Sequence, residues 1–247
     1  MLNFIKKKYS RLLSSSKVLK INFILHKFFG EDDLGNIGFN FQDKPNRFEI
    51  IQKIIITKKY RSYLEIGCFA DEIFNKIKIQ QKVGVDPVSG GTIRKTSDDF
   101  FKSNSDKFDC IFIDGLHVME QTDRDIPNAL KHLNEGGIIM MHDCNPPTEK
   151  HTITPRVQKA WNGTVFKTWI KMRCTRDDLK MFVIDSDWGC GIIQKGEQKV
   201  WDKDSVEKCI DYSYLEKNRE SLLNLISADE FNNLFRKKEW WEQNESN

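Results

Sequence analysis

The sequence predicts a doubly wound α/β fold in which helices cover both faces of a mostly parallel, seven-stranded sheet. Along residues 46–200, short apolar segments alternate with segments whose apolar residues recur at helical spacing. This alternation is typical of a parallel sheet with helical crossovers. The strand-like segments are almost continuously apolar, as expected for strands buried on both faces. The first of them, residues 63–67, ends in a glycine at the edge of the sheet where ligands of such folds bind.

Strands and helices are assigned from these patterns in chain order. The strands are expected at residues 63–67, 82–86, 92–95, 109–114, 137–141, 180–184 and 191–193. The helices are expected at residues 47–57, 69–78, 98–102, 119–133 and 161–171. A C-terminal helical region is expected at residues 214–235, where residues 227–230 give a capping signal between two helices.

The chain of 247 residues is long enough for one large domain with additions at both ends. We expect an N-terminal helical extension and linker over residues 1–45, the main domain over 46–200 and a C-terminal helical extension over 201–247. Residues 1–27 contain basic residues but no acidic one. Such a basic amphipathic helix could contact an anionic membrane or a partner protein. The alternative is a helix packed on the main domain with a solvated basic face.

Composition excludes several classes of function. The formal net charge of +3 is too small to indicate a nucleic-acid partner. The six cysteines form no C-x-x-C pair, so we expect free thiols rather than a zinc site. No apolar run is long enough to span a bilayer, and the N-terminus lacks the pattern of a signal peptide. We therefore expect a cytoplasmic protein, which could lie peripherally on the inner face of the membrane and could form a homo-oligomer.

The first group of candidate site residues follows the first two strands. Gly67 would let a ligand approach the backbone closely at the end of the first strand. Glu65 could bind the ammonium group of an amino-acid ligand. Asp86 closes the second strand, where an acid can accept both ribose hydroxyls of a nucleoside. Together these residues predict a site for an adenosine-containing ligand.

Five segments resemble class I S-adenosylmethionine (SAM)-dependent methyltransferases, most closely the subgroup found in bacterial sugar and polysaccharide gene clusters. They are residues 63–67, 84–87 (Gly-Val-Asp-Pro), 96–101, 112–117 (Phe-Ile-Asp-Gly-Leu-His) and 142–146 (His-Asp-Cys-Asn-Pro). The resemblance covers about residues 45–195 and implies a Rossmann-like fold and a SAM-binding methyltransferase domain. It implies cofactor contacts for Glu65, Gly67, Cys68, Phe69, Asp86, Pro87, Ser97, Asp98, Asp114 and Gly115.

The loop after the first strand departs from the family pattern. Phe69 and Asp71 stand where the family commonly has further glycines. The glycine fingerprint of dinucleotide-binding folds is therefore missing, which argues against an NAD-dependent oxidoreductase or epimerase. SAM remains compatible with this loop because it has no pyrophosphate to be held at a helix N-terminus.

The second group of candidate site residues follows two later strands, which we expect to be neighbours. It consists of Asp114 and His117 after one strand and of His142, Asp143 and Asn145 after the next. The oxygens of Asp114, Asp143 and Asn145 could hold Mg²⁺. Alternatively, His117, or else His142, could act as a general base without a metal, with Asp143 as a further catalytic residue. A third interpretation gives His142 and Asp143 a structural role.

By the resemblance, we expect SAM-dependent O-methylation of a saccharide or glycan hydroxyl. A small phenolic or other metabolite is the alternative acceptor. A binding module that keeps the fold without activity is the alternative function, although the acids and histidines favour an enzyme. Aromatic residues at positions 161, 166 and 169 could stack on a sugar ring, but their helical spacing is more typical of a core.

Overall fold

The computed structural model describes residues 39–157 and 159–236. A seven-stranded sheet has the order β2-β1-β3-β4-β6-β5-β7. All neighbouring strands are parallel except β6, which runs antiparallel to both β4 and β5. The strands are β1 (Ser62–Ile66), β2 (Gln81–Val85), β3 (Phe108–Ile113), β4 (Leu133–Met141), β5 (Leu179–Ile184), β6 (Cys190–Lys195) and β7 (Leu225–Ile226).

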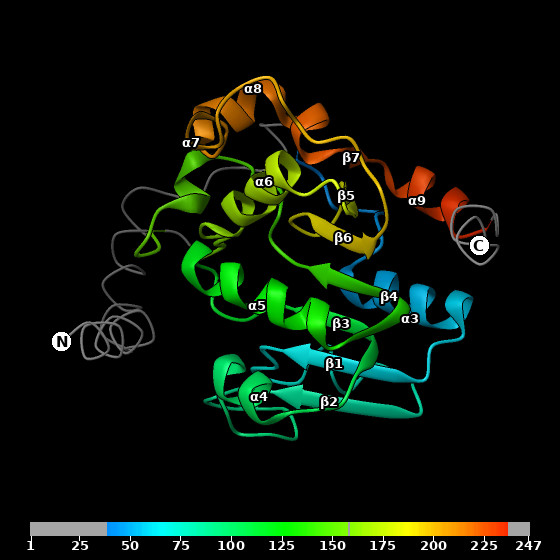
Figure 1. Cartoon of the computed structure of the whole chain (residues 1–247). Coiled ribbons are helices and arrows are strands. Elements are labelled where there is room, and N and C mark those ends of the chain that lie inside the picture. The colour runs from blue at the N-terminus through cyan, green and yellow to red at the C-terminus, as the bar shows by residue number, and fades with distance from the viewer. Residues whose placement is uncertain (1–38, 158, 237–247) are drawn as a thin grey trace.

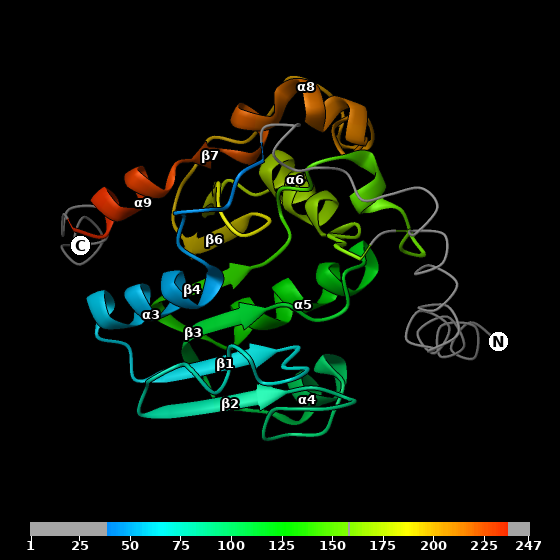
Figure 2. The same ribbon diagram turned by 180° about the vertical axis from the view of Figure 1, so that it is seen from behind.

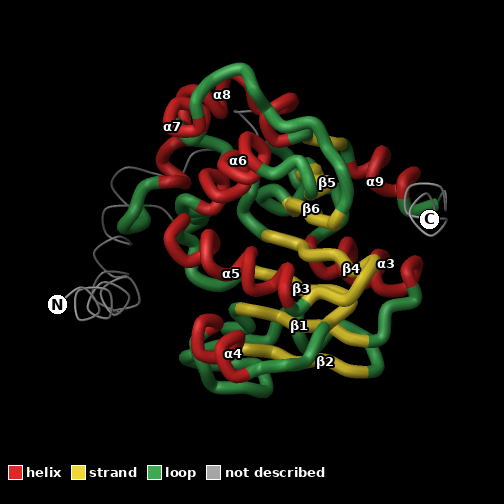
Figure 3. The backbone as a smooth tube through the Cα atoms, in the orientation of Figure 1, coloured by secondary structure: helices red, strands yellow, loops and turns green. Residues whose placement is uncertain are grey.

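Helices lie on both faces of this sheet. Figures 1 and 2 show α4, α5 and α6 over one face and α3 with α9 over the other. The helices are α3 (Arg47–Lys58), α4 (Ser97–Ser103), α5 (Met119–Lys131), α6 (Val165–Thr175), α7 (Val206–Cys209), α8 (Tyr212–Leu223) and α9 (Ala228–Leu234), with a 3₁₀ turn η1 (Glu149–Thr152). The alternation of helices and strands along the middle of the chain is visible in Figure 3. The predicted doubly wound α/β fold is confirmed.

The apolar strands supply two separate cores. In β3, Ile111 and Ile113 pack with α4, α5 and α6, whereas Cys110 and Phe112 pack with α3 and α9. This division follows from the alternation of side chains along a strand. Continuous apolar strands were therefore the correct signal for burial on both faces.

The helix α3 begins at a capping box. The Asn46 side chain accepts from the backbone N–H of Glu49, and the Glu49 carboxylate accepts from the N–H of Asn46. Such a box satisfies donors that the first helical turn leaves free. The capping box fixes the start of α3, whose first residue is Arg47.

Four details of the secondary structure differ from the prediction. Residues 69–78 form turns and no helix, and the chain adopts positive φ at Phe69 and Asp71, which interrupts helical geometry. Residues 92–95 contribute only an isolated bridge at Ile93. The helix predicted from residue 161 begins at residue 165, because Gly163 has φ of 62°. Residues 225–226, predicted as helix, add the strand β7 to the sheet.

The carboxyl ends of β1, β2, β3 and β4 meet at one edge of the sheet because these strands are parallel. Most of the predicted site residues follow these strand ends, whereas Glu65 lies within β1 and Ser97 and Asp98 begin α4. No helix within the described ranges is both long and apolar enough to cross a membrane. The predicted basic N-terminal helix lies outside the described residues.

Candidate functional site

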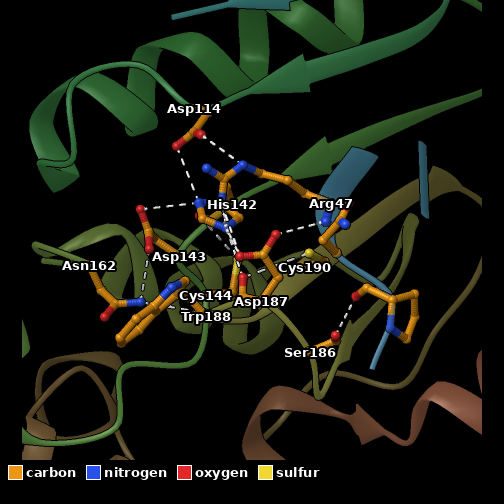
Figure 4. A network of polar contacts seen from close by, with 12 residues as sticks. Arg47, Asp114, His142, Asp143, Cys144, Asn162, Ser186, Asp187, Trp188 and Cys190 are labelled. Carbon is orange, nitrogen blue, oxygen red and sulfur yellow. Dashed lines mark hydrogen bonds and ion pairs between the residues drawn. The ribbon is translucent and has the colours of Figure 1, made fainter. Parts of the chain in front are cut away.

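Two neighbouring strand ends bring acids and histidines together. Ile113 of β3 pairs with Met141 of β4, so that Asp114 and His142 are the next residues of adjacent strands. Asp143 adopts φ of 64°, a conformation that turns the chain sharply after the strand. Figure 4 shows Asp114, His142 and Asp143 pointing toward one another. The expectation that these two segments meet is confirmed.

His117 lies between the two carboxylates. Its Nε2 is 3.2 Å from Oδ1 of Asp114, and its Nδ1 is 2.9 Å from Oδ2 of Asp143. Its side chain is 25% exposed, against 6% for Asp143 and 5% for His142. Of the two histidines, His117 is therefore the one that a substrate can reach.

His142 is more buried than His117, and one of its ring nitrogens faces the two carboxylates while the other bonds to Asp187. Its Nε2 donates to the backbone oxygen of Asp187 at 2.7 Å. Its Nδ1 lies 3.3 Å from Asp114 Oδ1 and 3.4 Å from Asp143 Oδ2, yet it is buried without a hydrogen bond. A buried polar atom without a partner costs free energy, so this nitrogen is an unsatisfied feature of the site.

The charges of the cluster shift one another's pKa values. Burial alone lowers the pKa of His117, but Asp143 and Asp114 outweigh it and raise this pKa to about 10. Burial opposes ionisation of Asp143, but His142 and His117 hold its pKa at about 2. The same histidines keep the pKa of Asp114 well below its usual range despite burial. At neutral pH His117 is thus a cation between two anions.

The segment before α6 covers His117. The carbonyl of Trp161 accepts from His117 Nδ1 at 3.0 Å, and the indole stacks on the imidazole at 5.5 Å with an interplanar angle of 17°. Thr164 donates its backbone N–H to the carbonyl of His117. A side chain at Gly163 would put its Cβ 1.8 Å from that carbonyl. Trp161 therefore contributes to the site rather than to the core.

Replacing Gly163 by alanine should displace His117. The added Cβ collides with the His117 carbonyl, and φ of 62° is unfavourable for alanine. We expect Gly163→Ala to lower the free energy of unfolding by about 1–3 kcal/mol. Thermal unfolding measures this loss. Gly136→Ala is the matched control, because Gly136 also has positive φ but its Cβ would meet no atom within 4 Å. An equal loss in both variants would contradict a collision with His117.

The end of β1 adjoins the four residues Asp114, His117, His142 and Asp143, which we call the acid–histidine cluster. Gly67 has φ of 93°, and a Cβ there would lie 2.2 Å from the carbonyl oxygen of Asp114. Glu65, two residues earlier, is buried and accepts a hydrogen bond from the Tyr63 hydroxyl at 2.7 Å. Burial raises the pKa of Glu65 to about 7. A buried carboxylate without a basic partner beside a tight backbone approach is a suitable place for a ligand's ammonium group.

Asp86 holds the loops after β1 and β2. Its carboxylate accepts from the backbone N–H groups of Phe69 at 3.0 Å, Val88 at 2.7 Å and Ser89 at 2.9 Å. Phe69 and Val88 are the most exposed large apolar residues among those described, at 74% and 77%. The predicted ribose-binding acid is thus engaged by backbone donors, and two of the donating residues, Phe69 and Val88, have exposed apolar side chains.

Three of the remaining predicted residues follow the ends of β1, β2 and β3. Cys68 is buried and its thiol faces the carbonyl of Glu65, whereas Pro87 is exposed. Gly115 follows Asp114 directly, and a Cβ at this position would make only ordinary contacts with Ile66.

Three further predictions concern residues that bond elsewhere. Ser97 and Asp98 begin α4 and bond to Gln121 of α5, and Asp98 also pairs with Arg124. Asn145, predicted as a metal ligand, bonds instead to Asp185 and Arg219.

Three site residues were not predicted from the sequence. Asn162 donates to Oδ1 of Asp143 at 3.0 Å. Arg47 and Asp187 form an ion pair of 3.0 Å beside His142. Arg47 precedes β1 and Asp187 follows β5, and no motif connects them to residues 114–143. An arginine at the start of a helix and an acid in a turn are ordinary solvent-exposed residues in most sequences, so the pattern carried no signal.

The acid–histidine cluster has the donors that a divalent cation requires. Asp114, His117 and Asp143 each offer a ligand atom within 4.8 Å of one another. The Nδ1 of His142 also lies near the same two carboxylates. With bonds of about 2.1 Å, adjacent ligands of an octahedral cation lie about 3 Å apart. The separations of 3.3 and 3.4 Å between His142 Nδ1 and the two carboxylates are close to this value. A ligand set that combines carboxylates with an imidazole is more typical of Mn²⁺ or Fe²⁺ than of Mg²⁺.

Comparisons with known proteins found one family model and several similar solved structures. Residues 70–144 match a family model described as a methyltransferase domain. Three solved structures illustrate the similarity. An SAH-bound methyltransferase from Podospora anserina is 15% identical over 74% of this chain and 97% of its own, with a TM-score of 0.49. An O-methyltransferase from Bacillus cereus in complex with SAH is 15% identical over 70% and 95%, with a TM-score of 0.42.

The third structure is the O-methyltransferase TomG from Streptomyces achromogenes in complex with SAM. It is 13% identical over 76% of this chain and 94% of its own, with a TM-score of 0.43. No curated protein matches the chain. In its central part the chain is therefore similar to a methyltransferase domain.

Proposed function

We propose that the protein is a SAM-dependent O-methyltransferase whose acceptor is a hydroxyl of a saccharide or glycan. The observation that carries this proposal is the contact between Gly67 and the backbone of Asp114. It joins a ligand-binding strand end, with the buried acid Glu65, to a cluster able to remove a proton. Methyl donor and acceptor would therefore meet at one sheet edge. SAM would supply an electrophilic methyl group that needs no further activation.

The protein's own part in the reaction is to orient the acceptor and to remove its proton. The acceptor oxygen attacks the methyl carbon in line with the departing sulfur, the C–S bond breaks and the C–O bond forms. His117 takes the hydroxyl proton at Nε2, which lies 3.2 Å from Oδ1 of Asp114 and belongs to the more exposed of the two histidines. His142 is buried and its Nε2 is engaged by Asp187, which supports the choice of His117 as the base.

The free site keeps His117 protonated, so it must lose this proton before it can act as a base. Binding of SAM would help, since its sulfonium charge offsets the two carboxylates that raise the pKa of His117. A divalent cation, when bound, would lower the pKa of the acceptor hydroxyl and help to orient it. Asp114 and Asp143, with His142 Nδ1, would hold such a cation and leave His117 free.

The test is transfer of a radiolabelled methyl group from SAM to a panel of acceptors. The panel contains monosaccharides, nucleotide sugars and oligosaccharides, with catechol and simple phenols as the alternative class. We expect labelled saccharide ethers and no labelled phenol. Labelled phenols alone would overturn the saccharide acceptor, and SAM binding without transfer to any acceptor would favour a binding module. Repeating the assay with EDTA and with added Mg²⁺ or Mn²⁺ decides the metal requirement.

A further inference from the structure

The turn between β5 and β6 has an unusual backbone. Asp187, Trp188 and Gly189 have φ of 41°, 65° and 91° in succession. Positive φ at a bulky residue such as tryptophan is rare and unfavourable, so that surrounding contacts must maintain it. Such strain occurs most often at functional sites.

The carbonyl groups of this turn hold the segment that follows β4. The carbonyl of Asp187 accepts from His142 Nε2 at 2.7 Å. The carbonyl of Trp188 accepts from the side chain of Asn162 at 3.2 Å, and Asn162 donates to Asp143 as well. Two backbone hydrogen bonds join the same segments. The N–H of Asn145 donates to the carbonyl of Trp188, and the N–H of Cys144 donates to the carbonyl of Gly189. The strained turn thus sets the position of residues 142–145.

Arg47 clamps the turn from α3. The carboxylate of Asp187 accepts from the backbone N–H of Arg47 at 2.7 Å and pairs with its Nη1 at 3.0 Å. The Nε of Arg47 is buried, without a hydrogen bond, 3.7 Å from Oδ2 of Asp114. One guanidinium therefore connects the strained turn with the acid at the end of β3 (Figure 4).

We propose that Arg47 and Asp187 are positioning residues for methyl transfer. Their clamp maintains the left-handed turn, the turn orients His142 and Asp143, and Arg47 directs the second oxygen of Asp114. Both residues lie outside the segment that matches the methyltransferase domain, residues 70–144. The inference rests on the proposed methyl-transfer function of the same site. The proposal adds two residues to the site, and neither of them contacts Glu65 or the atoms that react.

The chain contains a matched control for this clamp. Lys44 and Asp185 form an ion pair of 2.7 Å between the same two segments, just before α3 and just after β5. The contacts of Lys44 do not include the acid–histidine cluster. If the Arg47–Asp187 pair served only to tie the segments together, Lys44→Gln would have the same consequences as Arg47→Gln.

The experiment compares the full-length wild type with Arg47→Gln, Arg47→Lys, Asp187→Asn and Lys44→Gln. Imidazole ¹⁵N–¹H spectra report the environment of His142, calorimetry measures SAH affinity, and the labelled-methyl assay gives kcat and KM. We expect Arg47→Gln to shift the His142 nitrogen signals and lower kcat about tenfold, with SAH affinity unchanged. Arg47→Lys should restore part of kcat, since it keeps the charge but not the planar fork. Lys44→Gln should resemble the wild type.

Asp187→Asn keeps a backbone-bonding oxygen and removes only the charge, so it replaces Arg47→Gln if that variant does not fold. Unchanged His142 signals in the folded variants, or equal effects in Lys44→Gln, would overturn the clamp. Absence of SAH binding in the wild type would instead contradict the proposed function, while the spectra would still decide the role of Arg47. The two proposals can therefore fail separately.

Discussion

Replacing His117 by glutamine should abolish most of the methyl transfer. Glutamine can still donate to the carbonyl of Trp161 but cannot accept a proton from the acceptor hydroxyl. Loss of a general base typically lowers the rate by about 10²–10⁴-fold. We expect kcat to fall by about 10³-fold in the labelled-methyl assay, with SAH affinity close to that of the wild type. His132→Gln is the control, because the His132 ring bonds to the backbone carbonyls of Asn128 and Asn104 and packs on Phe101, away from His117.

The pH dependence of the rate tests the same role. Asp143 and Asp114 raise the pKa of His117 to about 10 against the effect of burial, so the neutral base becomes more abundant as pH rises. In the wild type without added metal, kcat/KM should therefore increase from pH 6 toward pH 9. This increase should be absent in His117→Gln. A wild-type rate that is flat over this range, or a His117→Gln variant with normal kcat, would contradict His117 as the base.

Replacing Glu65 by glutamine should weaken SAM binding by roughly 30-fold at pH 8, the size expected for one hydrogen-bonded charge pair. The carboxylate would pair with the ammonium group of SAM only when ionised, and burial raises the pKa of Glu65 to about 7. The affinity of the wild type for SAM should thus increase as pH rises through about 7. Calorimetric titrations at pH 6 and pH 8 measure both effects. A Glu65→Gln affinity that keeps the wild-type pH dependence would show that Glu65 does not pair with SAM.

The same substitution should stabilise the free protein at high pH. The pKa of Glu65 is raised from 4.5 to about 7, so this group's contribution to stability is complete below about pH 4.5 and is lost as pH rises through 7. Above pH 8 this loss amounts to about 3 kcal/mol. Glu65→Gln should remove it and raise the denaturation midpoint at pH 8 but not at pH 5. Glu120→Gln, at an exposed position of α5, is the control. Equal stability of wild type and Glu65→Gln at pH 8 would contradict a buried, ionised Glu65.

Much of the fold could be predicted because its signals are local. Five of the six residues of β3 are buried, and such burial on both faces appears in the sequence as a largely apolar run. The loop after β1 was predicted wrongly as a helix because apolar spacing in residues 69–78 resembled one. The spacing does not reveal that Phe69 and Asp71 adopt positive φ and hold the loop to Asp86 and Gly91.

The sequence by itself determined the order of the strands' polar ends, and with it the meeting of Asp114 and His117 with His142 and Asp143. Parallel strands place their carboxyl ends at one edge, so order along the chain is sufficient for this conclusion. Only the tertiary structure decided what surrounds them. Arg47, Trp161 and Asp187 reach the cluster from segments separated by 44 to 140 positions from their partners. Contacts between residues so far apart in the sequence depend on how the helices pack and where they place the loops. No periodicity or motif in a single sequence predicts them.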